Sequence, residues 1–340
     1  MLPRILGWSV VLGTAAVAAV LAWPQAFGLQ DQWIAAHVVA LRGAAAVCAG
    51  ATAAVFGLLA LTGPGRRFAA AMATILMVFA VGNAGVLAAR GLGAPRDSAQ
   101  AATDSITVLS WNTLGEVPDA STIAGLALDE GADVVVLPET TEPLGEDVAV
   151  AMREGGRPMW VHTQAFDEVA KARSTTLLIS PDLGDYRVVN EAFPGPPGNT
   201  NTLPSVVAEP VGGDGPRIVA VHAVAPIRWE LRNWRSDLDW LAGQCSGEDV
   251  IMAGDFNATV DHFAGRGVDG GDLGRCADVA ARAGWGGVGT WPTRLPALLG
   301  SPIDHVMATP SWSVADFRVV EGLDDAGSDH RPIVATLVRA

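Results

Sequence analysis

Polar residues of catalytic types recur at one kind of place in this sequence, directly after a short apolar run. The set is Asn112, Glu139, His222, Asp255, Asn257, Asp304, Asp329 and His330. Carboxylates and imidazoles can move protons or hold a divalent cation, and amides can hold a phosphate oxygen. Each residue alone also has a structural explanation, as a turn residue, a helix cap or a satisfied core histidine. Their repeated placement after predicted strands favours one shared site.

The stretch Ala253-Gly254-Asp255-Phe256-Asn257 shows this pattern most clearly, since it follows the apolar run Val250-Ile251-Met252. Side chains two residues apart on a strand face the same way. The side chains of Asp255 and Asn257 are therefore expected to point into the same small region, an arrangement that suits a phosphate and its attacking water. The Asp-x-Asn turn is weak support by itself, because both residue types favour turns through their own backbone hydrogen bonds.

Two parts of the 340-residue chain differ in composition. Residues 1–96 carry six Arg, no Lys and one acidic residue, a net charge of +5, whereas the rest carries 16 basic and 35 acidic residues, a net charge of −19. Half of all residues are hydrophobic and the mean hydropathy is positive, which is unusual for a wholly soluble protein. We predict a membrane region at 1–90, a Gly-, Ala- and Pro-rich linker at 91–103 and a globular domain at 104–340.

Three charge-free apolar runs lie in the first part, at about 5–23, 43–62 and 68–89. Each has about the 20 residues that a helix needs to cross a bilayer. The first could instead be a cleaved signal peptide, but Leu21-Ala22-Trp23-Pro24 is a poor cleavage site and two more runs follow. Buried helices of a soluble core are a further alternative, although a domain of this size rarely needs three such runs. The pattern predicts three transmembrane helices.

Arginines in short loops usually lie on the cytoplasmic side of a membrane. The six arginines that flank these runs would lie three on each side, so this rule gives little preference for either orientation. Arg66 and Arg67 form the tightest pair, in a very short turn. Placing that turn in the cytoplasm makes this a multi-pass cell-membrane protein whose acidic domain is extracytoplasmic.

Beyond residue 103, strand-like runs alternate with helical ones. Strands are predicted at 106–110, 133–137, 175–179, 186–189, 205–209, 217–222, 250–253, 302–308 and 332–338, and helices at 119–130 and 230–241. The run at 133–137 is continuously apolar, which is typical of a strand buried on both faces. The segment 230–241 has Leu231, Trp234 and Leu238 at helical spacing. This mixture predicts an α/β sandwich.

Six segments together resemble the endonuclease/exonuclease/phosphatase superfamily, which has the deoxyribonuclease I fold. They are Leu109-Ser110-Trp111-Asn112, Leu137-Pro138-Glu139, His222-Ala223-Val224-Ala225-Pro226, Gly254-Asp255-Phe256-Asn257, Ile303-Asp304-His305-Val306 and Gly327-Ser328-Asp329-His330-Arg331-Pro332. The resemblance covers most of 104–340. It implies two packed mixed β-sheets flanked by helices, a four-layer sandwich, and divalent-metal-dependent hydrolysis of phosphoesters. The apolar part resembles three-span N-terminal regions of some bacterial members.

By this resemblance, Glu139 is the main metal ligand, with Asn112 beside it and Asp329 as a further carboxylate. Hard carboxylate oxygens suit Mg²⁺ or Mn²⁺. A polar residue often precedes the metal-binding Glu in the family, where this chain has Pro138, and His305 stands where an aromatic residue is common. Neither departure removes an implied ligand, but both leave the substrate open.

The resemblance also implies the catalytic roles. His330 would contact the scissile phosphate, with its imidazole oriented by Asp304. His222 would protonate a leaving oxygen or hydrogen-bond the phosphate. Asp255 would position or deprotonate the attacking water, and Asn257 would hold a phosphate oxygen. Both Asp255 and His330 stay open as the general base.

Two cysteines of the globular domain, Cys245 and Cys276, flank the Gly254–Asn257 motif, and Cys48 lies in the second apolar run. In an extracytoplasmic domain Cys245 and Cys276 could pair and close a loop of about 30 residues. Two free buried thiols are the alternative.

These observations predict a membrane-anchored, Mg²⁺- or Mn²⁺-dependent phosphoester hydrolase with no organic cofactor. A non-catalytic membrane protein that binds a partner through the same fold is the alternative. The substrate stays open between a nucleic acid, a lipid headgroup and a small phosphoester. The net charge of −19 and the single Lys171 provide no basic stripe for a polyanion. Arg228, Arg232 and Arg235 could face a phosphate or form the solvated face of a helix.

Overall fold

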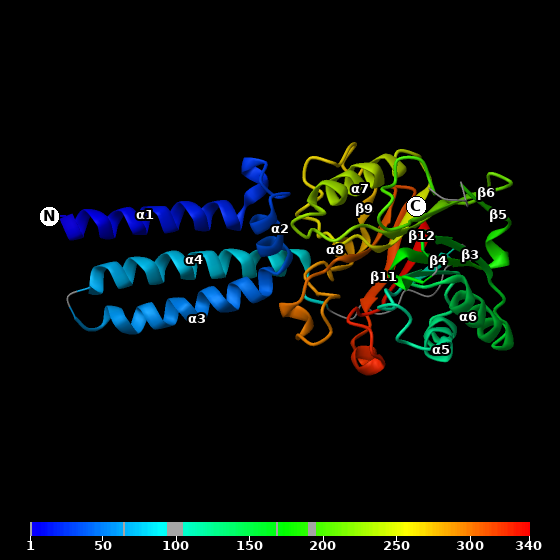
Figure 1. The fold of residues 1–340 in the computed structure, drawn as a ribbon, viewed down its shortest axis with the longest axis horizontal. Coiled ribbons are helices and arrows are strands. Elements are labelled where there is room, and N and C mark those ends of the chain that lie inside the picture. The colour runs from blue at the N-terminus through cyan, green and yellow to red at the C-terminus, as the bar shows by residue number, and fades with distance from the viewer. Residues whose placement is uncertain (1, 64, 94–104, 168, 190–194) are drawn as a thin grey trace.

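An apolar helical bundle and an α/β domain make up the molecule, and they lie end to end in the computed structural model (Figure 1). It describes residues 2–63, 65–93, 105–167, 169–189 and 195–340. The bundle contains α1 (Leu2–Ala22), α2 (Trp33–Ala40), α3 (Arg42–Ala60) and α4 (Arg66–Arg90). Helices α1, α3 and α4 run side by side away from the α/β domain, and α2 lies at the junction (Figure 1).

Two of the three predicted membrane spans are confirmed as helices of sufficient length and hydropathy, α3 and α4. Their apolar side chains face outward, as shown by Leu58 and Val78, which are 68% and 67% exposed. The first run also forms a helix, but its described apolar part, 6–22, is shorter than a full span. Three transmembrane helices therefore stay a prediction. Of the predicted linker, only 91–93 lies within the described residues.

Two six-stranded sheets form the α/β domain, and each contains both parallel and antiparallel pairs. The first has the order β11-β12-β1-β2-β4-β3 and the second β5-β6-β7-β8-β10-β9. The strands of the first sheet are β1 (Ser105–Ser110), β2 (Val134–Pro138), β3 (Trp160–Ala165), β4 (Ser174–Ile179), β11 (Trp312–Val319) and β12 (Ile333–Arg339). Those of the second are β5 (Tyr186–Val188), β6 (Val206–Pro210), β7 (Arg217–His222), β8 (Val250–Asp255), β9 (Ala277–Asp278) and β10 (Asp304–Ala308).

Three hydrophobic cores separate four layers. The central core joins the facing sides of the two sheets, where Val108 and Val136 of one sheet share a cluster with Ile251 and Ala253 of the other. Outside the first sheet lie α5 (Ala120–Asp129) and α6 (Glu142–Glu154), and outside the second lies α7 (Leu231–Gln244). The predicted sandwich of two mixed sheets flanked by helices is confirmed.

Several elements lack a clear pattern in the sequence and were not predicted. They are α2, α6, β3, β9, β11, the short α8 (Val279–Ala283) and the 3₁₀ turns at Pro24–Phe27, Lys171–Arg173, Pro181–Leu183, Ala297–Leu299 and Glu321–Ala326. In β11, a bulge between Val314 and Asp316 breaks the period-two alternation. Strand β3 is an edge strand whose Trp160 is 55% exposed, so it has no apolar run to mark it.

A disulfide joins Cys245, after α7, to Cys276, before β9, with a Cα–Cα distance of 5.8 Å. Both residues are fully buried. The pairing expected of Cys245 and Cys276 is therefore present, and Cys48 is free.

Reduction of this disulfide is expected to lower the free energy of unfolding by about 3–4 kcal/mol, because the bond closes a loop of 31 residues in the unfolded chain. The measurement is the denaturant midpoint of the full chain with and without a reductant. The Cys48→Ser variant should show the same decrease. An unchanged midpoint on complete reduction would contradict the expected contribution.

Candidate active site

The predicted site residues meet at one end of the sandwich because of strand order and register. In the second sheet, His222, Asp255 and Asp304 lie side by side across β7, β8 and β10. In the first sheet, β1 and β2 run parallel and lead into Asn112 and Glu139 at the same edge. The turn before β12 then carries Asp329 and His330. Every site residue predicted from the sequence lies at this end.

Buried His330 sits between carboxylates. Its Nδ1 lies 2.8 Å from Asp304 Oδ2, while its Nε2 lies 3.8 Å from Asp255 Oδ2 and 3.9 Å from Asp329 Oδ1. Burial alone would lower the pKa of His330, but Asp304 and Asp255 outweigh it and raise the pKa to about 10. The imidazole is therefore protonated at neutral pH.

Asp255 is the first residue of a tight turn, and its carboxylate stabilises that turn by accepting hydrogen bonds. Its Oδ1 accepts from the backbone N–H of Asn257 at 2.8 Å, and its Oδ2 accepts from Asn112 Nδ2 at 3.1 Å. Asn257 has a φ of 46°, a left-handed conformation that Asn tolerates, and donates its Nδ2 to Ala223 O at 2.9 Å. Burial raises the pKa of the Asp255 carboxyl above its ordinary value, and the nearby His330 opposes this shift. Asp255 is therefore a stronger base than an exposed aspartate.

Glu139 and Asn112 are joined by a hydrogen bond from Asn112 Nδ2 to Glu139 Oε1, 3.2 Å long. Asn112 Oδ1 accepts from the backbone N–H of Leu114 at 3.0 Å, which fixes the amide. Glu139 has a φ of 61°, a sparsely populated conformation that is typical of functional positions when it occurs in a Glu. Burial raises the pKa of this carboxyl.

His222 lies opposite Glu139, with its Nε2 4.0 Å from Glu139 Oε1. Its Nδ1 is buried and has no hydrogen-bond partner within the part of the chain that the structure describes. Burial lowers the pKa of His222 to about 3, so the ring is neutral. The two histidines of the site therefore differ in charge at neutral pH.

Trp291 is a site residue that the sequence did not reveal. Its Nε1 donates to Asp329 Oδ2 at 2.8 Å, and Thr293, two residues on, donates its backbone N–H to Asp329 O at 2.9 Å. The second carboxylate oxygen, Asp329 Oδ1, is buried and accepts no hydrogen bond from any described residue. A tryptophan in a loop carries no local signal of such a contact.

The carboxylates of the site fit a divalent metal ion. Asp255, Asp304 and His330 bring their ligand atoms within 4.8 Å of one another, and all three residues are buried. In this cluster Asp304 Oδ2 already pairs with His330 Nδ1. Asp329 lies outside the cluster, and its Oδ1 has no hydrogen-bond partner among the described residues. Hard carboxylate oxygens with open lone pairs are the ligands that Mg²⁺ and Mn²⁺ prefer. A buried cluster of acidic residues and a histidine therefore exists. Because His330 is protonated and paired with Asp304, the oxygens that could hold such an ion belong to the other carboxylates of this end of the sandwich.

His305 lies outside the site, although it follows Asp304, because neighbouring side chains on a strand face opposite sides. Its Nδ1 lies 3.1 Å from Asp278 Oδ1 and its Nε2 lies 2.9 Å from Ala258 O. The ring packs against Phe256 and Phe263. This departure from the family pattern therefore lies in the core outside the second sheet and not among the candidate site residues.

Replacing His305 by glutamine is expected to destabilise the protein more at pH 6 than at pH 9. Burial would lower the pKa of His305, but Asp278 outweighs it and raises the pKa above its ordinary value of 6.5. The stabilisation is fully present below pH 6.5 and is lost as the pH rises through the folded-state pKa. Breaking a buried pair costs about 3 kcal/mol at the low pH. Thermal unfolding of the full chain measures this, and an equal loss at both pH values would contradict a protonated ring.

Arg228, Arg232 and Arg235 do not form a phosphate-facing cluster. The guanidinium of Arg228 stacks over Trp33 of α2 at 5.0 Å, and Arg235 Nε donates to Asp31 O at 3.2 Å. Arg232 is exposed. Two of the three arginines thus contact the helical region and not the site.

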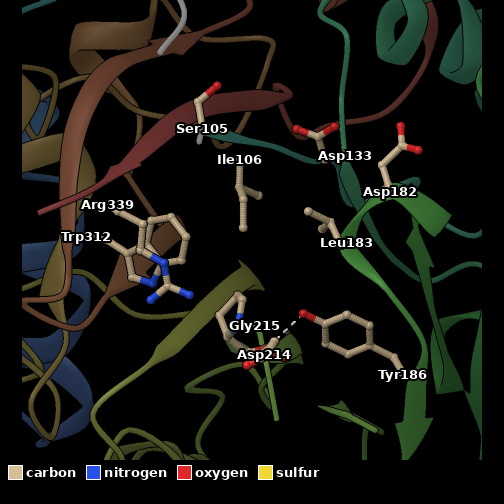
Figure 2. A pocket seen from close by; sticks show the side chains of 11 residues that line it. Ser105, Ile106, Asp133, Asp182, Leu183, Tyr186, Asp214, Gly215, Trp312 and Arg339 are labelled. Atoms are coloured by element: carbon tan, nitrogen blue, oxygen red, sulfur yellow. Dashed lines mark hydrogen bonds between the residues drawn. The ribbon is translucent and has the colours of Figure 1, made fainter. Parts of the chain in front are cut away.

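A cavity of about 560 Å³ lies at the opposite end of the sandwich, where β1 begins (Figure 2). Several of its polar groups are paired, since Tyr186 donates to Pro216 O and Asp133 bonds Arg157. Arg339 likewise bonds Asp249. The cavity is separate from the candidate site, and we assign it no role.

The sequence of residues 109–330 matches the Endonuclease/Exonuclease/phosphatase family. Solved structures with this fold include an endonuclease/exonuclease/phosphatase from Beutenbergia cavernae, at 20% identity over 70% of this chain and 72% of that one, with a TM-score of 0.51. A family protein from Leptotrichia buccalis has 11% identity over 68% and 99% of the chains and a TM-score of 0.52. A humanized D. rerio TDP2 has 17% identity over 68% and 98% and a TM-score of 0.51. These likenesses show the fold. No curated protein matches the sequence significantly.

Proposed function

This chain belongs to the endonuclease/exonuclease/phosphatase family, and we propose that it is a membrane-anchored, divalent-metal-dependent phosphoester hydrolase. One observation carries the proposal: a protonated His330, bonded to Asp304, lies between Asp255 and Asp329 at the end of the sandwich where Glu139 also lies. The family name covers nucleases and phosphatases, both of which hydrolyse phosphoesters.

Glu139, Asp329 and Asn112 would hold the metal. The first two supply carboxylate oxygens, and the amide of Asn112 fixes Glu139. When bound, a divalent ion polarises a phosphoryl oxygen and offsets negative charge on the leaving group. Trp291 orients Asp329 by binding one of its oxygens and so leaves the other available.

His330 would bind the scissile phosphate through Nε2, because Nδ1 is committed to Asp304. A cation held beside a phosphate stabilises the negative charge that develops on the phosphoryl oxygens in the transition state. Asp304 keeps the ring protonated and oriented, as an acidic residue does for a catalytic histidine in other hydrolases.

The arrangement favours Asp255 as the general base. Asp304 and Asp255 raise the pKa of His330, so the imidazole keeps its proton, while burial raises the pKa of the Asp255 carboxyl, which makes it the better proton acceptor of the two. Asn257 would hold a phosphate oxygen from the same turn by giving up its 3.2 Å hydrogen bond to Asp255 Oδ2, since its other amide hydrogen is donated to Ala223 O. Neutral His222 would donate a hydrogen bond to the phosphate or to the leaving oxygen.

The apolar helices would anchor the enzyme in the cell membrane through three spans, α1, α3 and α4. The disulfide between Cys245 and Cys276 favours an extracytoplasmic position for the catalytic domain, because disulfides persist in oxidising compartments. This agrees with a cytoplasmic Arg66–Arg67 turn.

A small phosphoester or a lipid headgroup is a better substrate for this site than a nucleic acid. Nucleic-acid backbones are usually bound by several Lys and Arg side chains, and the acidic domain has one Lys and commits Arg228 and Arg235 to the helical region. Bound metal ions can invert the local charge, so an extracellular nucleic acid belongs in the test.

A substrate panel tests the proposal. The full chain, purified in detergent, is assayed with Mg²⁺ or Mn²⁺ on nucleic acids, phosphoinositides, sphingomyelin and phosphomonoesters. We expect hydrolysis of at least one lipid or small phosphoester. Failure on every class would favour the alternative, a non-catalytic protein that binds a partner through this fold.

A further inference from the structure

Asp261 is a buried carboxylate of the catalytic domain, and every hydrogen-bond donor to its side chain among the described residues comes from the helical region. Arg42 approaches it with two nitrogens, from Nε to Oδ2 at 2.9 Å and from Nη2 to Oδ1 at 2.7 Å. Arg90 does the same, at 2.8 Å for both bonds. Gln25 donates a further hydrogen bond to Oδ1. The side chains of Asp261 and Arg42 are each only 1% exposed.

These contacts make Asp261 the point at which the helices of the bundle meet. Arg42 begins α3, Arg90 ends α4 and Gln25 follows α1. Arg42 Nη1 also donates to Ala22 O at the end of α1 and to Asn83 Oδ1 inside α4, at 3.1 Å and 2.7 Å. Two paired guanidinium groups on one buried carboxylate form a geometrically strict contact, because each planar fork fixes its own orientation.

The same carboxylate lies four residues beyond Asn257, on the segment that carries the catalytic turn. This segment comprises residues 255–262. Its middle is fixed by two contacts to the domain: Trp234 Nε1 donates to Asn257 O, and His305 Nε2 lies 2.9 Å from Ala258 O. Its far end is fixed by the bundle twice, through Asp261 and through His262, whose Nε2 lies 3.1 Å from Ala36 O in α2. The bundle therefore holds one end of the segment that places Asp255 and Asn257.

A second segment connects the bundle to the other side of the site. The backbones of α4 and the loop after α8 touch, with bonds from Gly286 N to Arg90 O and from Gly287 N to Gly91 O at 3.0 and 2.9 Å. A side chain at Gly91 would collide with Gly284 O at 2.0 Å, so the approach requires glycine. This loop continues to Trp291, which binds Asp329.

We propose that Asp261 is a positioning residue of the catalytic site and that the apolar helices, besides anchoring the protein, are a structural part of that site. The Arg42–Asp261–Arg90 contact fixes the segment 255–262, and so the placement of Asp255 and Asn257 relative to His330. Loss of the contact should lower the rate of the chemical step more than it weakens substrate binding, because small displacements of reacting groups act on kcat. The kinetic part of this inference rests on the proposed hydrolase activity.

The test compares Asp261→Asn with Asp269→Asn in the full chain, in detergent. Asp269 is 76% exposed and lies eight residues further on, so it is a matched control for the same substitution. We expect kcat to fall about tenfold or more in Asp261→Asn, with KM changed by less than about twofold, and neither to change in the control. Asp261→Glu, which keeps the carboxylate, should recover part of kcat. An unchanged kcat, or a loss that lies wholly in KM, would overturn the inference.

Arg90→Lys provides the second variant if Asp261→Asn does not fold. It keeps the charge but loses the paired hydrogen bonds at a residue that is 19% exposed. It should lower kcat several-fold at constant KM, and an unchanged kcat contradicts the inference.

Amide hydrogen exchange separates this inference from the proposed function. If the wild-type chain hydrolyses nothing in the panel, the proposed function has failed. The effect of the Arg42–Asp261–Arg90 contact on the segment 255–262 is then measured by amide exchange of that segment. The comparison is between Asp269→Asn and whichever of Asp261→Asn and Arg90→Lys folds. Faster exchange in that segment supports the coupling, and unchanged exchange refutes it.

Discussion

Replacing His330 by alanine is expected to lower kcat by about 10³-fold, one of the two largest effects that we expect of single substitutions at this site. The imidazolium sits with Nε2 3.8 Å from Asp255 Oδ2 and 3.9 Å from Asp329 Oδ1, so it lies where the phosphate would meet both the water and the metal. Alanine removes a buried positive charge at that point and leaves Asp304 and Asp255 facing each other without it.

Asp304→Asn should produce a smaller loss, about 10²-fold, because the ring stays in place but loses the carboxylate that holds its proton. The two changes act on one unit, so the double variant should be no worse than His330→Ala alone. The measurement is kcat and KM on the substrate found in the panel. His37→Ala, at an exposed position of α2, is the control and should keep full activity. Fully additive losses would show that Asp304 does not act through His330.

Glu139→Gln is expected to lower metal-dependent activity by about 10³-fold and to weaken the apparent affinity for Mg²⁺. The substitution keeps the shape of the side chain but removes the charge that a hard cation requires. Glu142→Gln, three residues further on at the exposed start of α6, is the matched control and should behave like wild type.

Metal titrations of both Glu139→Gln and Glu142→Gln, with initial rate as the readout, distinguish a ligand from a merely structural residue. A ligand variant should need more Mg²⁺ to reach half of its own maximum rate. If Glu139→Gln keeps the wild-type half-saturation and rate, Glu139 does not hold the metal.

The sandwich of two mixed sheets, and the meeting of the candidate site residues at one end of it, could be predicted from the sequence because these residues follow strand ends. An apolar run followed by Asp, Glu, Asn or His is visible locally, and strand pairing then brings such ends together, as the register of His222, Asp255 and Asp304 shows. Residues that support the site from loops do not follow an apolar run, so this pattern does not identify them. Trp291 reaches Asp329 across 38 positions of sequence, and nothing near it in the chain indicates this partner.

The contacts between the helical bundle and the α/β domain could not be predicted from the sequence either. Asp261 looks like any acidic residue after a turn, and its partners Arg42 and Arg90 lie 219 and 171 positions away. In the sequence the same arginines indicated only the ends of apolar helices. Their pairing with a buried carboxylate depends on tertiary structure, which hydrophobic periodicity does not encode.

Restoration of activity by a metal is the most direct test of the proposed hydrolase. The full chain is treated with EDTA, and the initial rate of hydrolysis is followed as Mg²⁺ or Mn²⁺ is added back. We predict no activity in EDTA, saturable recovery with either ion, and no comparable recovery in Glu139→Gln. Hydrolysis that is insensitive to EDTA, or that Glu139→Gln recovers in full, would contradict a metal-dependent site at Glu139.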